Sequence, residues 1–325
     1  MATLTTQSAS GATVVRPDAP ETNLYEWTLG HAAQVDTLLR EPGAIIFRGF
    51  AMPSREDFEK ICTEVSGPFM EYEYRSNNRQ RLTGSLFNST EYPASERIPF
   101  HNEMSYFAVW PRHVWFLCEI PAAADGDTPL ADSAEVYRQL HADIREPFER
   151  LGVRYTRTIG PDVDLSWRDV FQTDDQRAVG EYCDRFEIEH EWIGDETVRT
   201  AQNRPAVVLH PHTGDRIWFN QAHLFHPSSL GEDVHHWLLR RYGEDNLPRN
   251  AMFGDGSPIP LPALEAIRAT YARLSMPTNW ESGDVLVFDN MRYAHARDRF
   301  TAPRRIVVGL TGAVDDSQIQ LPASL

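Results

Sequence analysis

The sequence is poor in cysteine and lacks long hydrophobic runs. Its 325 residues include three cysteines, Cys62, Cys118 and Cys183, which are too few and too widely spaced for a disulfide framework or a zinc ribbon. We therefore expect buried free thiols in a reducing cytoplasm. No apolar stretch approaches the roughly 18 residues that would indicate a membrane span. The N-terminal "MATLTTQSASGATVV" also lacks the charged start and apolar stretch of a secretory signal.

Positive charge is scarce as well. The chain has 31 Lys and Arg against 47 Asp and Glu, which gives a formal net charge of -16. A broad nucleic-acid footprint needs clustered basic residues, so we expect no nucleic-acid partner.

The chain also lacks internal repeats, a glycine-rich phosphate loop and a linker rich in Pro, Gly or Ser. We expect a disordered lead-in over 1–20 and a single domain over 21–325, with an insertion or lid around 150–260. The apolar patterns predict strands at 43–50, 113–120, 283–290 and 304–312, a hairpin at 204–220, and helices at 54–65, 133–151 and 261–274. This favours an α+β, mainly β fold, a sandwich or jelly roll with flanking helices.

The stretch "IPFHNEMSYFAVWPRH" at 98–113 contains a candidate metal-binding pair, His101 and Glu103. On a strand, residues i and i+2 point to the same face, so an extended H-x-E would direct both side chains at one point. The pair alone is weak evidence, because His141 and Asp143 repeat the spacing. That second pair lies in a predicted helix, where residues i and i+2 do not face each other, so we reject it.

A third candidate ligand, His295, follows the predicted strand "DVLVFDN" in "NMRYAHARDRF". Two histidines and one carboxylate form the face that non-haem Fe(II) oxygenases use. Two arginines begin the next predicted strand, and one of them could hold an anionic co-substrate by a bidentate contact.

Several motifs together resemble a known family. "FHNEMSY", "IPAAADGDTPLADSAEVY", "IWFNQAHLFHP" and "GDVLVFDNMRYAHARDRFTAPRRI" match, in order, the taurine dioxygenase-type Fe(II)/2-oxoglutarate oxygenases. They are most similar to the syringomycin-type amino-acid hydroxylase branch. The resemblance runs from about residue 40 to residue 312, and it implies a double-stranded β-helix (jelly-roll) core.

The resemblance implies a role for five residues. His101, Glu103 and His295 would bind Fe(II), Thr128 would hydrogen-bond 2-oxoglutarate, and Arg305 would bind its distal carboxylate. Arg304 would then point to the opposite face of the strand, since strand neighbours alternate. Many family members carry Asp where this chain has Glu103.

The implied reaction consumes O2 and 2-oxoglutarate, releases succinate and CO2, and most often hydroxylates an unactivated C–H bond. We expect the substrate to be an amino acid or a similar small polar metabolite of natural-product biosynthesis. Desaturation, cyclisation and attack on an aminoacyl group tethered to a peptidyl carrier protein remain alternatives, as does a non-catalytic jelly-roll binding protein. Carrier proteins are usually acidic, so the net charge of -16 favours a free small molecule.

Substrate contacts are harder to assign. Asn220 is a candidate because amides orient amino-acid head groups, and Tyr106 and Asn88 flank the metal pair. Tyr106 could equally fill the core. His223 and His226, three residues apart, could form half of a zinc site on a helix, but no nearby Cys or carboxylate completes it, so we disfavour zinc. The oligomeric state is left open.

Overall fold

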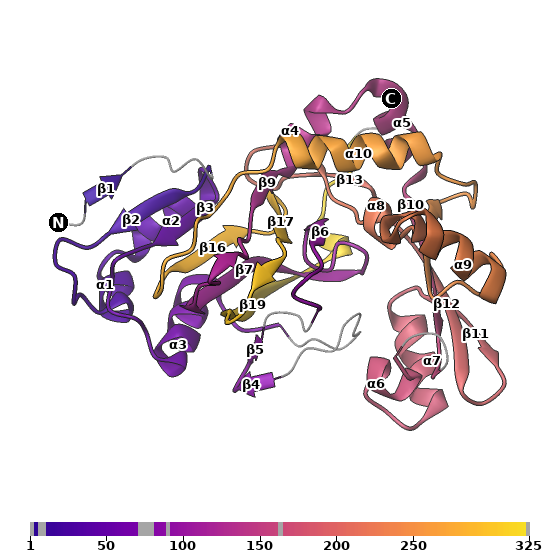
Figure 1. Cartoon of the computed structure of the whole chain (residues 1–325), viewed down its shortest axis with the longest axis horizontal. Helices are drawn as coiled ribbons and strands as arrows, with labels where there is room; N and C mark the ends of the chain where they lie inside the picture. Colours follow the sequence, from indigo (N-terminus) through magenta and orange to yellow (C-terminus); the bar gives the residue numbers. More distant parts are fainter. Residues whose placement is uncertain (1–2, 6–10, 71–80, 89–91, 162–164, 323–325) are drawn as a thin grey trace.

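The computed structural model describes residues 3–5, 11–70, 81–88, 92–161 and 165–322 (Figure 1). Two sheets form the jelly-roll core, and their strands pair antiparallel except for β2 with β3. The larger sheet has the order β1-β2-β3-β16-β7-β19-β5-β4, and the smaller has the order β6-β17-β9. The strands of the larger sheet are β1 (Thr3–Thr5), β2 (Thr13–Arg16), β3 (Ala44–Phe47), β4 (Arg81–Thr83), β5 (Leu86–Asn88), β7 (Val109–Ile120), β16 (Val285–Asp289) and β19 (Arg305–Asp315). Those of the smaller sheet are β6 (Ile98–His101), β9 (Leu130–Asp132) and β17 (Tyr293–Arg297).

The core between the two sheets is built by alternating side chains. On β19, Ile306 and Val308 pack with Leu130 and Tyr293 of the smaller sheet, whereas Val307 belongs to a separate cluster on the other face. This is the period of two that a strand imposes. A side chain's position along β19 therefore decides whether it faces the space between the sheets.

Three helices cover the outer face of the larger sheet, namely α1 (Leu24–Gly30), α2 (Ala32–Arg40) and α3 (Arg55–Ser66). The predicted helix at 54–65 is confirmed, and Ser54 caps it by accepting a hydrogen bond from the Asp57 N–H at 3.1 Å. Phe58 and Ile61 are fully buried in the cluster that this helix shares with the sheet. The three cysteines are buried and unpaired, as expected.

Four strands between residues 153 and 253 form a separate antiparallel sheet with the order β11-β12-β10-β15. Figure 1 shows this sheet at the opposite end of the molecule from α1–α3. Its strands are β10 (Val153–Ile159), β11 (Glu189–Ile193), β12 (Thr197–Arg204) and β15 (Arg249–Phe253), accompanied by α6 (Trp167–Phe171), α7 (Gln176–Arg185), α8 (Ala222–Phe225) and α9 (Glu232–Tyr242). The predicted hairpin is β13 (Val207–Leu209) paired with β14 (Arg216–Trp218), and the predicted helix near 261–274 is α10 (Leu261–Arg273).

Two expectations are corrected. The segment 133–151, predicted as one helix, forms two helices, α4 (Ser133–Gln139) and α5 (Ala142–Leu151), with the break at Leu140, whose backbone is extended. The expected disorder of 1–20 is wrong for residues 13–16, because β2 pairs in parallel with β3 and Val15 is fully buried.

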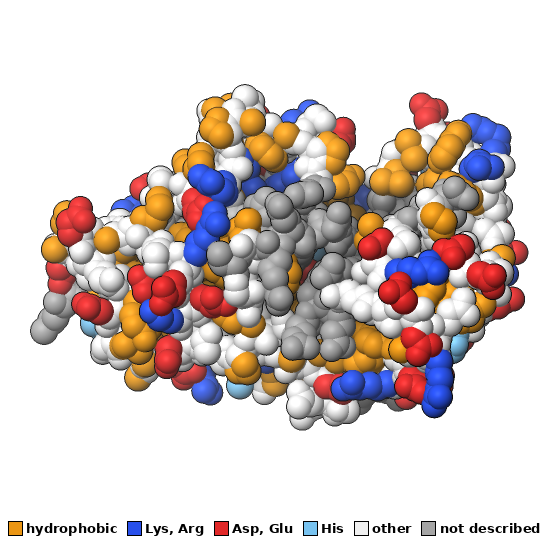
Figure 2. Space-filling model, turned by 90° about the horizontal axis from the view of Figure 1, so that it is seen from below, with side chains coloured by type: hydrophobic (Ala, Val, Ile, Leu, Met, Phe, Trp, Pro, Cys, Tyr) orange, Lys and Arg blue, Asp and Glu red, His pale blue; other side chains and the backbone are white. Residues whose placement is uncertain are grey.

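Within the described part of the chain, every helix is too short or too polar to cross a membrane. On the face shown in Figure 2, the Lys and Arg side chains are interspersed with Asp and Glu and form no continuous basic area.

Candidate metal centre

The two histidines meet because their strands are neighbours. β6 and β17 are antiparallel, and His101 lies directly opposite His295 in the register, so both side chains emerge on one face. Their ring centroids are 4.3 Å apart. Nδ1 of His101 lies 2.8 Å from the Pro99 carbonyl oxygen, so it carries the proton and donates to that oxygen. This fixes the tautomer that leaves Nε2 of His101 for a metal ion.

Glu103 reaches the same point from a turn and not from a strand. β6 ends at His101, and the chain turns through Glu103 and Met104, whose φ of 58° lies in the left-handed region. Oε2 of Glu103 is 3.9 Å from Nε2 of His101 and 4.0 Å from Nε2 of His295. These separations are too long for hydrogen bonds, and they suit donor atoms that each lie about 2 Å from one shared ion.

The three residues fit a divalent transition metal. One ligand atom from each of His101, Glu103 and His295 lies within 4.8 Å of the others, and all three side chains are largely buried. Two imidazoles and one carboxylate on one face leave the remaining coordination positions open, the arrangement typical of non-haem Fe(II) oxygenases. Among the described residues, no other group of three His, Cys, Asp or Glu side chains converges in this way.

Asn290 positions Glu103, and the sequence analysis did not identify it. Its Oδ1 accepts a hydrogen bond from the Glu103 N–H at 2.6 Å, and its Nδ2 donates to the Glu103 carbonyl at 2.9 Å and to the Pro111 carbonyl at 2.9 Å. Asn102 in turn donates to the Asn290 carbonyl at 2.7 Å. The side chains of both asparagines are completely buried, so the turn that carries the carboxylate is fixed by the protein itself.

A pocket extends from the metal-binding residues between the two sheets. Its lining comprises Ile98, His101, Glu103, Phe116, Thr128, His295, Ala296, Arg297, Arg304 and Val308. Thr128 is thus one of the lining residues. Its Oγ1 accepts hydrogen bonds from Arg304 Nη2 at 3.1 Å and from Trp280 Nε1 at 3.0 Å.

Arg304, and not Arg305, faces this pocket. Arg304 directly precedes β19 and lines the pocket, whereas Arg305, the first residue of β19, is not among the lining residues. The Arg305 side chain is 50% exposed and pairs with Glu119 at 2.9 Å. The structure thus contradicts the placement of Arg305 in the site and brings Arg304 there in its stead.

Two guanidinium groups, those of Arg297 and Arg304, line the pocket. Burial, with a contribution from the charge of Arg297, lowers the pKa of Arg304 to about 10. Burial also lowers the pKa of Arg297, which donates to the carbonyls of Tyr92, Pro93 and Glu96. An anion in the pocket would stabilise both charged guanidinium groups.

Two of the predicted substrate residues, Asn220 and Tyr106, are not among the residues that line this pocket. The amide of Asn220 donates to the Ala206 carbonyl at 3.0 Å and accepts from the Ala222 N–H at 3.1 Å, so it supports the backbone. The ring of Tyr106 packs against Tyr155 and Phe225. The side chain of Asn88 lies outside the part of the chain that the structure describes.

The two rejected metal pairs remain rejected, although one for a different reason. His223 is buried with Nε2 at 2.9 Å from the Phe100 carbonyl, and Nδ1 of His226 contacts the Ser228 hydroxyl. His141 is the N-cap of α5, and its Nδ1 does lie 3.2 Å from Asp143. Both of those side chains are exposed, however, and no third ligand among the described residues joins them.

Comparison with known proteins agrees with this geometry. Residues 7–311 match the family described as "Taurine catabolism dioxygenase TauD, TfdA family". The chain therefore belongs to this family, the taurine dioxygenase-type Fe(II)/2-oxoglutarate oxygenases that the sequence motifs resemble. It is 35% identical over 288 residues to the dapdiamide synthesis protein DdaC of Enterobacter agglomerans, covering 89% of this chain and 88% of the relative.

A plant protein and a bacterial structure are also similar. A clavaminate synthase-like protein of Arabidopsis thaliana is 30% identical, with 85% of this chain and 83% of the relative covered. The crystal structure of PvcB from Pseudomonas aeruginosa superimposes with a TM-score of 0.57 at 17% identity, covering 95% of this chain and 90% of PvcB. At that identity the similarity to PvcB shows the shared fold.

Proposed function

We propose that this protein hydroxylates an unactivated C–H bond of a free amino acid or similar small polar metabolite in natural-product biosynthesis, using Fe(II), 2-oxoglutarate and O2. The observation that carries the proposal is one pocket in which His101, Glu103 and His295 meet at one end and Arg304 and Thr128 at the other. The relative DdaC takes part in dapdiamide synthesis, which supports a biosynthetic role.

Different residues of the site would bind the iron and the co-substrate. His101, Glu103 and His295 would hold the iron, which supplies the activation of O2 for oxidation of co-substrate and substrate. Arg304 would hold the distal carboxylate of 2-oxoglutarate by a charge-assisted contact, so that the other end of the co-substrate lies at the metal. The ring of Phe116 packs edge-on against that of His295, with ring centroids 5.4 Å apart, and helps to keep water from this side of the metal centre.

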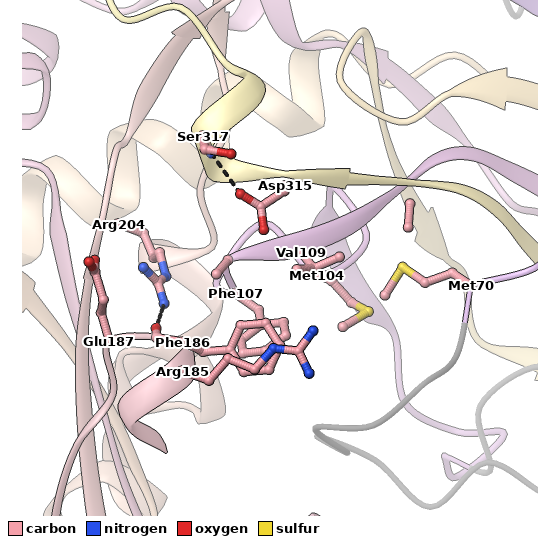
Figure 3. Close-up of a pocket in the computed structure, with 12 residues that line it drawn as sticks. Met70, Met104, Phe107, Val109, Arg185, Phe186, Glu187, Arg204, Asp315 and Ser317 are labelled. Carbon is pink, nitrogen blue, oxygen red and sulfur yellow. Dashed lines mark hydrogen bonds between the residues drawn. The ribbon is translucent and has the colours of Figure 1, made fainter. Parts of the chain in front are cut away.

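A second cavity, of about 610 Å³, supports a small polar substrate. It is lined by Met70, Met104, Phe107, Ala108, Val109, Arg185, Phe186, Glu187, Arg204, Ala313, Asp315 and Ser317 (Figure 3). Met104 directly follows the metal-binding Glu103. The combination of apolar, cationic and anionic side chains suits a ligand that carries an ammonium group, a carboxylate and an apolar part.

Arg185 is the exposed cation of this cavity, whereas Arg204 is buried and donates to the Phe186 carbonyl at 2.7 Å (Figure 3). Arg185→Ala should therefore raise the KM for the amino-acid substrate about tenfold, the value of one charge-assisted contact, and leave the KM for 2-oxoglutarate unchanged. Arg240→Ala, at the exposed end of α9, is the matched control.

The reaction itself is tested by screening amino acids for substrate-stimulated succinate formation by the iron-loaded protein, with the product mass measured in each case. A product that has gained one oxygen atom supports hydroxylation, whereas loss of two hydrogens shows desaturation or ring closure. Failure of the iron-loaded protein to convert 2-oxoglutarate to succinate, with or without any amino acid, would contradict the proposal.

A further inference from the structure

Thr128 has a defined hydrogen-bonding polarity. A threonine hydroxyl can donate once and accept twice. Both acceptor positions of Thr128 are occupied, one by Arg304 Nη2 and one by Trp280 Nε1. Neither a guanidinium nor an indole N–H can accept a hydrogen bond. The hydroxyl proton is therefore the remaining capacity of Thr128, and the structure shows no acceptor for it among the described residues.

That remaining proton lies at the pocket. Thr128 is 2% exposed and lines the cavity that also contains Arg304 and the three metal-binding residues. A buried hydroxyl without an acceptor costs free energy, so a carboxylate in the pocket would complete its hydrogen bonding. The contact would add to the charge-assisted hydrogen bonds from Arg304.

Trp280 is held firmly in the place from which it donates. The carboxylate of Asp127 accepts hydrogen bonds from the N–H groups of Thr278 and Asn279, at 2.8 and 3.1 Å. Arg48 donates to the Asn279 carbonyl at 2.8 Å. The indole also packs edge-on against Phe116, with ring centroids 6.5 Å apart.

We propose that Trp280 is a positioning residue for the co-substrate: its indole N–H occupies one acceptor site of Thr128 and thereby directs the threonine hydroxyl to donate to the distal carboxylate of 2-oxoglutarate. The inference rests on the proposed function and adds a residue that touches neither metal nor co-substrate. Without this N–H, the Thr128 hydroxyl can turn and offer a lone pair to the carboxylate in place of a proton.

The test is the Kd for 2-oxoglutarate, measured by calorimetry on the Mn(II)-loaded protein, in which no turnover occurs. Trp280→Phe keeps an aromatic ring but removes the donor, and it should weaken binding about fivefold, the value of one hydrogen bond of roughly 1 kcal/mol. Trp237→Phe, a 51% exposed tryptophan on α9, should bind as the wild type does. Thermal unfolding of both variants shows whether they are folded.

Coupling between the two residues separates positioning from general packing. In a Thr128→Val background, Trp280→Phe should cause no further loss of affinity, whereas in a Thr128→Ser background, which keeps the hydroxyl, the fivefold loss should persist. 2-Oxobutyrate lacks the distal carboxylate, so Trp280→Phe should not change its Kd. Because both keto acids are compared in the same Trp280→Phe protein, this comparison remains informative even if that variant is less stable than the wild type.

Three results would each overturn the role of Trp280. The first is a further loss of 2-oxoglutarate affinity when Trp280→Phe is added to Thr128→Val. The second is an equal loss of affinity for 2-oxoglutarate and 2-oxobutyrate in Trp280→Phe, and the third is wild-type affinity of Trp280→Phe for 2-oxoglutarate. Failure of the wild-type Mn(II) protein to bind 2-oxoglutarate would contradict the proposed function itself and remove the basis of the inference.

Discussion

The side chain of Asn290 brackets the peptide groups of Glu103. Its Oδ1 accepts from the Glu103 N–H at 2.6 Å and its Nδ2 donates to the Glu103 carbonyl at 2.9 Å, although the two residues are 187 positions apart. Asn290 directly follows β16, the strand that pairs with β7 in the centre of the larger sheet. The core sheet thus fixes the turn that carries the Glu103 carboxylate, a candidate metal ligand.

Asn290→Ala should weaken both the fold and the metal site. The change leaves the N–H of Glu103 and the carbonyls of Glu103 and Pro111 without this partner. At about 1–3 kcal/mol for each buried unsatisfied group, the free energy of unfolding should fall by several kcal/mol. Loss of such a positioning contact should also reduce Mn(II) affinity about 10- to 100-fold.

Urea unfolding and calorimetric Mn(II) titration measure these two effects. Asn246→Ala is a matched control, because its amide makes a single hydrogen bond to the Tyr242 carbonyl at 3.3 Å away from the site. If the Asn290→Ala variant is folded and its Mn(II) affinity is unchanged, the hydrogen bonds from Asn290 are not needed to position Glu103.

The two H-x-acid pairs should behave differently towards metal. His101→Ala removes one of three ligands and should abolish measurable stabilisation of the fold by Mn(II), because ligand binding to the native state is what raises the unfolding temperature. His141→Ala removes an exposed imidazole and should leave that stabilisation intact. Loss of the Mn(II)-dependent shift in both variants, or in neither, would be inconsistent with the assigned site.

The structure also predicts a specific sensitivity to acid. Burial and the positive charge of Arg268 lower the pKa of His223 to about 3, whereas an unfolded histidine titrates near 6.5. Between these values the unfolded state binds more protons than the folded state. The contribution of His223 to stability is therefore fully present above pH ~6.5 and is lost as the pH falls, by at most about 1.4 kcal/mol per pH unit.

His223→Gln should flatten that dependence in the metal-free protein, because glutamine can still donate to the Phe100 carbonyl but does not titrate. Urea unfolding between pH 7 and pH ~4.5, with exposed His141→Gln as control, measures the slope. An identical slope in wild type and His223→Gln would show that His223 does not titrate on unfolding.

Much of the site could be predicted from the sequence. Several motifs in register indicated the family, and through it the three candidate metal ligands and Thr128, which the structure brings to one pocket. The extended geometry expected for His101 and Glu103 was only half correct, since the strand ends at His101 and Asn290 holds the backbone of Glu103 from 187 positions away. Hydrogen bonds between residues so far apart in the chain cannot be recognised from the local sequence around either residue.

The choice between the two arginines could not be made from hydrophobic pattern. After the two arginines, the run "IVVGL" is apolar at consecutive positions because this part of β19 is buried on both faces. The sequence therefore shows no alternation from which the inward arginine could be chosen. The structure places Arg304 in the pocket and pairs Arg305 with Glu119 outside it. Similarly, Asn220 resembled a substrate contact because nothing in the sequence shows that its amide is used by the backbone of Ala206 and Ala222.

The most direct test of the account is anaerobic titration of Fe(II)-loaded protein with 2-oxoglutarate, followed by the visible metal-to-ligand charge-transfer absorption of the chelate. The wild type and Arg305→Ala should develop the band at similar co-substrate concentrations, since Arg305 pairs with Glu119 outside the pocket. Arg304→Ala should require at least about 100-fold more 2-oxoglutarate, because it removes a buried charge-assisted contact. Absence of the band in the iron-loaded wild type, or a larger effect of Arg305→Ala than of Arg304→Ala, would contradict the account.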